Sequence, residues 1–126
     1  MAATVTCTET KHTSAKCIKW AWVSHTDGKV ATATAGAATT AYYDGKLITL
    51  TTVPGAAALA PDDNYDVFLY DDNGVDVLAG GGANRSTSAT QHVTFTSLGA
   101  VAGSKLTLYV ENAGDSNAGT VYLYIR

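Results

Sequence analysis

Three histidines and two cysteines are the side chains with the strongest chemistry in this 126-residue sequence. His12, His25 and His92 show neither a metal-binding spacing nor a helical spacing, and no nucleophile or phosphate-loop motif accompanies them. Cys7 and Cys17 are expected to be free thiols that pack as small apolar side chains. A disulfide between them is the alternative and would suit a secreted protein. The sequence therefore predicts no catalytic residue, no metal ligand and no cofactor.

The acidic run Asp71–Asp76 has the residue types with which a calcium loop begins. The bidentate glutamate of such a loop would stand six residues after Gly74, where this chain has Gly80. Asp and Asn also bond to their own backbone in tight turns, and Gly supplies the positive φ. We therefore expect a turn between two strands, with calcium binding as the alternative.

Apolar residues recur with period two along most of the chain, which is typical of strands. The clearest strand segments are Lys16–Ser24, Lys46–Val53, Tyr65–Tyr70, Gln91–Ser97, Lys105–Glu111 and Gly119–Arg126. Weaker candidates are Ala3–Thr10, Val30–Ala35 and Thr39–Tyr43. Alternation predicts one face for Ile48 with Leu50 and one face for Val93 with Phe95. The glycine-rich segment Leu78–Ser88 resists a strand interpretation and is either a contact loop or a plain connection.

Short strands at this spacing, separated by Gly, Asn and Asp turns, predict an all-β fold. We expect a two-sheet antiparallel sandwich, with a jelly roll favoured over an immunoglobulin-like arrangement. Residues 1–126 form a single domain, in which residues 1–14 are a possible extended arm that adds to a neighbouring sheet. The last two strands are expected to form a hairpin through the turn Asn112–Ala118.

Aromatic side chains fall on the outward side of three predicted strands. Burial of the aliphatic residues in each strand turns the intervening rings outward. The candidate protein-interface residues are Phe68, Tyr70, Tyr109, Tyr122 and Tyr124. Tyrosine suits interfaces because it covers a large area, freezes few rotamers and keeps a polar tip. The alternative is that a loop or the second sheet covers these rings.

Charge and hydropathy exclude several kinds of partner. The net charge is −3, and the eight Lys and Arg residues are scattered along the sequence, which argues against nucleic-acid binding. No apolar run approaches the ~18 residues that a membrane span requires. The N-terminus lacks the pattern of a signal peptide, so we expect synthesis and assembly in a cytoplasm.

Three segments resemble small virion proteins of tailed bacteriophages: Asn64–Ser86, Thr96–Arg126 and, more loosely, Ala41–Gly55. Proteins of this kind include capsid cement, or decoration, proteins with a jelly-roll-type fold. The resemblance implies a homo-oligomer that binds the outer surface of the assembled capsid and bridges subunits of the major capsid protein, with a trimer slightly favoured and a dimer as the alternative. It implies a location on the capsid surface of the virion after assembly in the host cytoplasm. It transfers no catalytic residue.

Two other functions stay open at this point. One is a head-fibre or tail accessory protein of the same particle. The other is a glycan-binding β-sandwich module, because jelly rolls commonly host lectins. Trp20 and Trp22 share a strand face with Ile18, which favours burial over a sugar-stacking platform. A hydrolase is the weakest option, because the sequence pairs no acid with a base.

Overall fold

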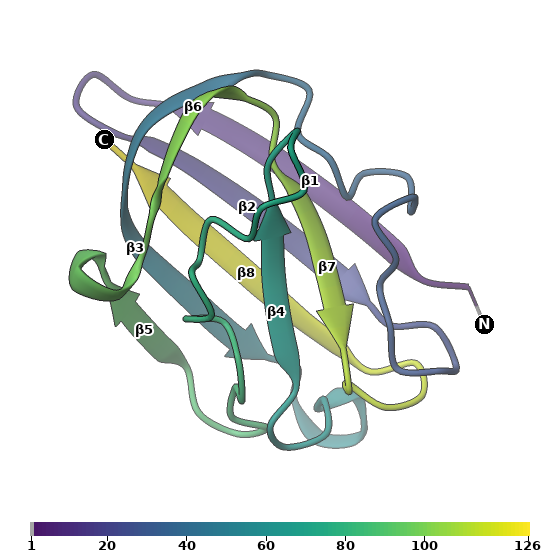
Figure 1. The fold of residues 1–126 in the computed structure, drawn as a ribbon. Helices are drawn as coiled ribbons and strands as arrows, with labels where there is room; N and C mark the ends of the chain where they lie inside the picture. Colours follow the sequence, from purple (N-terminus) through teal and green to yellow (C-terminus); the bar gives the residue numbers. More distant parts are fainter. Residues whose placement is uncertain (1) are drawn as a thin grey trace.

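The computed structural model describes residues 2–126 and is built almost entirely of strands (Figure 1). The strands are β1 (Thr4–Lys11), β2 (Lys16–Val23), β3 (Tyr43–Pro54), β4 (Asp66–Tyr70), β5 (Gln91–Thr94), β6 (Ala100–Ser104), β7 (Thr107–Glu111) and β8 (Ala118–Ile125). Two 3-10 helices of one turn each are η1 (Ala57–Leu59) and η2 (Phe95–Ser97).

The strands form two antiparallel sheets that pack face to face. The large sheet has the order β1-β2-β8-β3-β5, and β6 pairs with the first residues of β3. The small sheet consists of β4 and β7, which lie across the front of the large sheet in Figure 1. The predicted all-β sandwich is confirmed, whereas the jelly-roll arrangement stays a prediction.

Strict alternation in the central strands supplies the core between the sheets. Each strand buries every second side chain, because successive Cβ atoms point to opposite faces. The fully buried side chains include Ile18, Trp20 and Trp22 of β2, Val67 and Leu69 of β4, Leu108 and Val110 of β7, and Val121, Leu123 and Ile125 of β8. The prediction that Trp20 and Trp22 face the core is confirmed.

Two irregular segments widen the small sheet. Residues 30–39 run beside β7, where Val30 and Val110 exchange backbone hydrogen bonds and Leu108 donates to Ala37. The glycine-rich segment runs beside the other edge, on β4, where Val67 donates its N–H to the carbonyl of Gly82. A Cβ at Gly82 would collide with the carbonyl oxygen of Val67, so this close approach requires glycine. The segment is thus part of the second layer.

The expected hairpin between the last two strands is wrong. β7 pairs with β4 in the small sheet, while β8 lies between β2 and β3 in the large sheet. The connection crosses from one layer to the other, and Ser24 fixes it by donating to the carbonyl of Gly114 and accepting from the N–H of Asn117. Turn residues predict a reversal of the chain but not which strand the next one joins.

Two predicted face assignments are also wrong. The register of β3 shifts between Leu47 and Thr49, which is the signature of a β-bulge. Leu47 and Leu50 are consequently both buried, whereas Ile48 is not. Phe95 lies in η2 beyond the end of β5 and is half exposed, so it does not share the face of Val93, which packs against the core.

The N-terminal segment is a strand of the domain rather than a free arm. Thr4–Lys11 pairs with β2 over its whole length, from Thr4 opposite Val23 to Lys11 opposite Lys16. The part of the predicted arm that falls on Met1 lies outside the described residues. Of the other weak strand candidates, Val30–Ala35 and Thr39–Tyr43 form isolated bridges or join β3 instead of making separate strands.

Candidate interaction faces

The five candidate interface residues divide into two groups on opposite sides of the sandwich. Phe68 and Tyr70 of β4 and Tyr109 of β7 point outward from the small sheet. Tyr122 and Tyr124 point outward from β8 in the large sheet. The outward orientation follows the predicted alternation, and the role in an interface stays a prediction. Because the core separates the groups, no single flat partner surface can cover all five rings.

The outer side of β4 and β7 with Phe68, Tyr70 and Tyr109, here called the small-sheet face, holds one aromatic cluster. Phe68 stands directly opposite Tyr109 in the register, with ring centroids 5.7 Å apart. The ring of Tyr70 lies parallel to that of Phe68 at 5.8 Å and tilted to that of Tyr109 at 6.1 Å. Such distances allow all three rings to contact one another. The rings are partly exposed, so a partner can cover them.

Carboxylates border this cluster. Asp66 and Glu111 stand directly opposite each other at one end of the pairing, an arrangement that is unfavourable for like charges. Each is held by a neutral donor: Asn112 Nδ2 donates to Asp66 at 2.8 Å, and the Tyr109 hydroxyl donates to Glu111 at 3.1 Å. Partial burial, together with the nearby Glu111 carboxylate, raises the pKa of Tyr109. Tyr109 is therefore a neutral hydrogen-bonding group at physiological pH.

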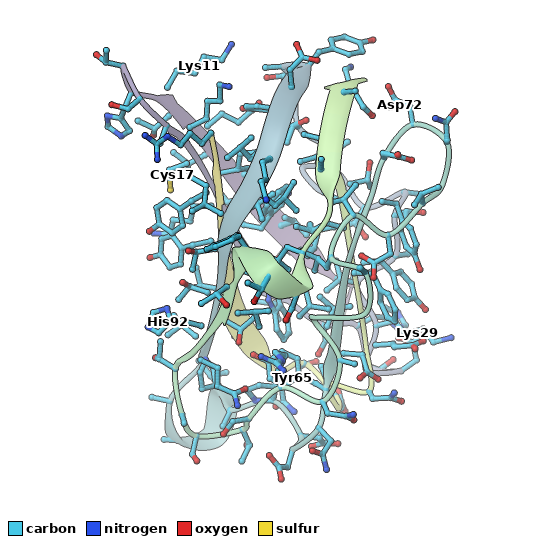
Figure 2. The ribbon with its side chains drawn as sticks, turned by 60° about the vertical axis from the view of Figure 1, so that its left-hand side comes forward. Lys11, Cys17, Lys29, Tyr65, Asp72 and His92 are labelled. Atoms are coloured by element: carbon cyan, nitrogen blue, oxygen red, sulfur yellow. The ribbon has the colours of Figure 1, made fainter. Side chains whose placement is uncertain are left out.

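The outer side of the large sheet, here called the large-sheet face, is built of cross-strand rows in which hydroxyl groups surround the two tyrosines. One row consists of Thr10, Cys17, Tyr124, Thr49 and Thr94. The next row consists of Thr8, Lys19, Tyr122, Thr51 and His92. Figure 2 shows Cys17 and His92 on this side of the molecule and Lys29 on the opposite side.

Contacts within these rows fix the two tyrosines. Lys19 Nζ lies 5.7 Å from the centroid of the Tyr122 ring, which is within the range of a cation–π contact. Burial and the neighbouring thiol of Cys17 raise the pKa of Tyr124, whose side chain is 36% exposed. Thr51 and His92 are hydrogen bonded at 2.9 Å beside them. The centre of this face therefore presents two aromatic rings among hydroxyl groups.

Acidic and basic residues are distributed unequally between the two layers, and the sequence does not reveal this distribution. Glu9 and Asp44 are the acidic residues carried by strands of the large sheet. The other nine of the eleven lie on β4, on β7 or in the loops that lead into or out of the small-sheet layer. Lys19 and Lys46 point outward from the large sheet, and Arg126 follows directly after β8. Among residues 2–126, Asp44 is the one acidic residue on the outward side of the large sheet, where it precedes Lys46 by two positions and accepts a hydrogen bond from the N–H of Gly103. The small-sheet face is acidic and the large-sheet face is basic.

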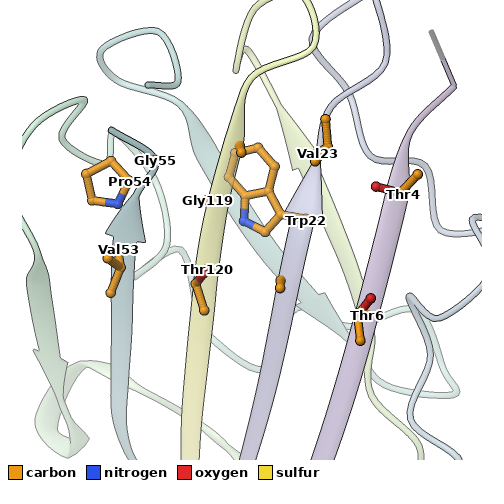
Figure 3. Close-up of a pocket in the computed structure, with 11 residues that line it drawn as sticks. Thr4, Thr6, Trp22, Val23, Val53, Pro54, Gly55, Gly119 and Thr120 are labelled. Carbon is orange, nitrogen blue, oxygen red and sulfur yellow. The ribbon is translucent and has the colours of Figure 1, made fainter. Parts of the chain in front are cut away.

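A groove of about 340 Å³ hollows one end of the large-sheet face (Figure 3). Thr4 and Thr6 of β1 form one wall, and Val53–Gly55 form the other. Gly119 is required beneath it, because a Cβ there would stand 2.5 Å from Cζ2 of Trp22. The lining consists of the Trp22 ring, small apolar side chains and hydroxyl groups, with no titratable side chain among the residues that form it.

The residues with catalytic or ligating chemistry stay apart. His12 lies in the β1–β2 hairpin, His25 follows β2 beside Asp27, and His92 is on β5. Within residues 2–126, no three His, Cys, Asp or Glu side chains are grouped so as to hold a metal ion. The same part of the chain contains no helix with the length and apolar character of a membrane span.

The predicted turn at Asp71–Asp76 is confirmed. Asp71 Oδ1 accepts hydrogen bonds from the N–H groups of Asn73 and Val75, and Gly74 has φ +78°. The carboxylate of Asp76 accepts from the N–H groups of Leu69, Leu78 and Gly80. Both carboxylates are thus engaged with backbone donors.

Both cysteines are free thiols, as expected. Cys7 points inward from β1, opposite Trp20, whereas Cys17 points outward from β2, opposite Thr10. Two side chains on opposite faces of one sheet cannot form a disulfide without backbone movement. Burial and the nearby Glu9 carboxylate raise the pKa of Cys7 to about 11, so its thiol stays protonated.

Comparison of the chain with protein-family models, with curated proteins and with solved structures found no match in any of the three searches.

Proposed function

We propose that this chain is a non-catalytic decoration protein of a bacteriophage capsid, which binds the outer surface of the assembled shell and stabilises it by bridging subunits of the major capsid protein. The observation that supports this proposal is the presence of outward rings on both sides of one rigid sandwich. A body with adhesive surfaces on opposite sides can hold two neighbours at once, and bridging a lattice requires this ability.

The mechanism would be mass action. A protein that binds only the assembled lattice stabilises that lattice by its free energy of binding. Modest contacts are sufficient when a homo-oligomer engages several subunits together, because the second contact forms at a high effective concentration. We propose a trimer in preference to a dimer, which light scattering of the purified protein would distinguish by mass.

The direct test compares expanded shells with and without the purified protein. The protein should raise the temperature at which shells rupture, and an unchanged rupture temperature would refute the proposal. A low, fixed copy number at one vertex or at the tail would instead favour a head-fibre or tail accessory protein.

Variants can assign the binding to the ring-bearing faces. The variants F68S/Y70S/Y109S and Y122S/Y124S should each weaken binding to shells. Y42S is the matched control, because Tyr42 is 61% exposed and lies outside both faces, near Lys105. Equal loss of binding in all three variants would contradict the assignment. Glycan-array binding that depends on Phe68, Tyr70 and Tyr109 would favour the glycan-binding module.

A further inference from the structure

Two cations stand side by side at one corner of the large-sheet face. Lys46 and Arg126 are direct cross-strand neighbours, which exchange backbone hydrogen bonds of 3.0 and 3.1 Å. Both side chains are exposed. Like charges directly opposite each other are destabilising in a sheet. An anionic group placed between them would relieve this repulsion.

The same two residues line a hollow that has an apolar wall. Lys46, Ile48, Phe95 and Arg126 enclose about 430 Å³. The Phe95 ring is 50% exposed, and Lys46 Nζ lies 5.0 Å from its centroid. A carboxylate between the cations with a short aliphatic chain against the ring would fit this arrangement. Glutamate side chains have this combination of groups.

We infer that the large-sheet face contacts the shell through an acidic surface of one capsid subunit, whose glutamate side chains enter the hollow between Lys46 and Arg126. The inference rests on the proposed function. Beyond the hollow, the face continues through Lys19 and the rings of Tyr122 and Tyr124. Within residues 2–126, its one outward carboxylate is Asp44, which accepts a hydrogen bond from the N–H of Gly103, so the cations Lys19, Lys46 and Arg126 outnumber it.

Low charge density favours a protein surface over a polyanion. Nucleic-acid binding draws its affinity from many phosphate contacts by clustered cations, and this face has three cations, Lys19, Lys46 and Arg126, among many uncharged hydroxyl groups. A flat face with tyrosines at its centre matches the composition of protein interfaces.

Geometry also argues against a second copy as the occupant. The acidic residues of this chain lie on the opposite layer, so a contact between the basic face of one copy and the acidic face of the next would repeat in one direction. Such a heterologous contact either builds open chains or closes a ring such as the proposed trimer, and a closed ring would cover the basic face of every copy and keep it from the shell. Binding to an acidic capsid subunit instead leaves the small-sheet face, with its aromatic cluster, available for the second neighbour that bridging requires.

The test measures binding to shells and, separately, to immobilised poly-L-glutamate. K46Q/R126Q should weaken both by about tenfold, since each exposed charge contact contributes modestly. K29Q/K105Q is the matched control, because it removes the same charge from the opposite layer and should bind within about twofold of the unchanged protein. Thermal unfolding checks that both variants fold.

The outcomes separate this inference from the proposed function. If the protein without substitutions does not bind shells, the decoration role is refuted. If K46Q/R126Q loses binding to poly-L-glutamate and K29Q/K105Q does not, the assignment of an acidic partner to the large-sheet face is still supported. Equal weakening in both variants, or in neither, overturns the inference. Binding to duplex DNA that is stronger than binding to poly-L-glutamate at the same salt concentration would overturn the assignment to a protein partner. If the molar mass of the protein in solution grows with protein concentration, and K46Q/R126Q abolishes this growth, the face binds a second copy instead.

Discussion

The hydroxyl of Tyr43 donates a hydrogen bond of 2.7 Å to Oε1 of Glu9 and thereby joins the start of β3 to the edge strand β1. The N–H of Ala41 donates to the same oxygen, and the N–H and hydroxyl of Thr40 donate to Oε2. One carboxylate therefore satisfies four donors of residues 40–43. Within the described part of the chain, β1 is an edge strand that pairs with β2 on one side, and this anchor ties its other side to residues 40–43.

The substitution Glu9→Gln should destabilise the fold. An amide offers one acceptor oxygen and places an NH2 group against donors, so unfolding should become easier by roughly 1–3 kcal/mol. Urea unfolding at pH 7 measures this change. A midpoint equal to that of the unchanged protein would contradict the anchoring role.

Protonation of Glu9 in acid should weaken the same hydrogen bonds. Partial burial by itself raises the pKa of Glu9, but the four hydrogen bonds outweigh it and lower the pKa to about 2. The unfolded value is about 4.3, so the carboxylate contributes its stability above that pH and loses it as the pH falls through about 2. Between the unfolded pKa and the folded pKa of Glu9, the urea midpoint of the protein without substitutions should fall by more than the urea midpoint of Glu9→Gln. Parallel curves would exclude Glu9 as the titrating group.

Tyr43 and Tyr65 form a matched pair for a hydroxyl deletion. Both are buried, but the Tyr43 hydroxyl donates to the carboxylate of Glu9, whereas the Tyr65 hydroxyl has the neutral hydroxyl of Thr52 beside it and makes no hydrogen bond of good geometry within residues 2–126. Tyr43→Phe should therefore destabilise by about 1–2 kcal/mol, and Tyr65→Phe should cost less or be neutral. Thermal unfolding of the two variants tests the order, and a reversed order would contradict it.

The glycine-rich segment allows a steric test. Gly82→Ala places a methyl group against the carbonyl oxygen of Val67 and should cost several kcal/mol or prevent folding. Gly80→Ala meets open space at φ +81°, so only a backbone penalty of about 1 kcal/mol applies. Equal effects of the two substitutions would show that the segment does not pack against β4.

The two thiols should react differently. A maleimide at pH 8 should label Cys17 on the large-sheet face and leave Cys7 unlabelled until the protein unfolds, because Cys7 faces inward and its pKa is raised to about 11. Mass spectrometry of the native and denatured protein counts the labels. Labelling of both thiols in the native state, or a disulfide between them after mild oxidation, would contradict the assigned faces.

Period-two alternation predicted the faces of β2, β4, β7 and β8 correctly, because each buries one side against a core. It failed where local irregularity intervenes. A bulge moves Leu47 and Leu50 to the same side, and a 3-10 turn takes Phe95 out of its strand. Strand β6 was missed because its small residues, Ala100–Ser104, carry no apolar alternation.

The charge difference between the two faces could not be predicted from the sequence. Lys46 and Arg126 are eighty residues apart and become neighbours only through the register of β3 and β8. The same limit explains the wrong hairpin, since Asn112–Ala118 predicts a turn but not the sheet that β8 joins. Outward rings such as Tyr109 and Tyr122 were predictable because their own strands determine their direction.

The proposed decoration role is tested most directly by a cryo-electron microscopy map of bacteriophage capsids mixed with the purified protein. The account predicts sandwich-shaped density on the outer surface of the shell, repeated across the lattice and touching at least two major capsid subunits, with the large-sheet face against the shell. A shell surface without such density, or density confined to the tail, would contradict it.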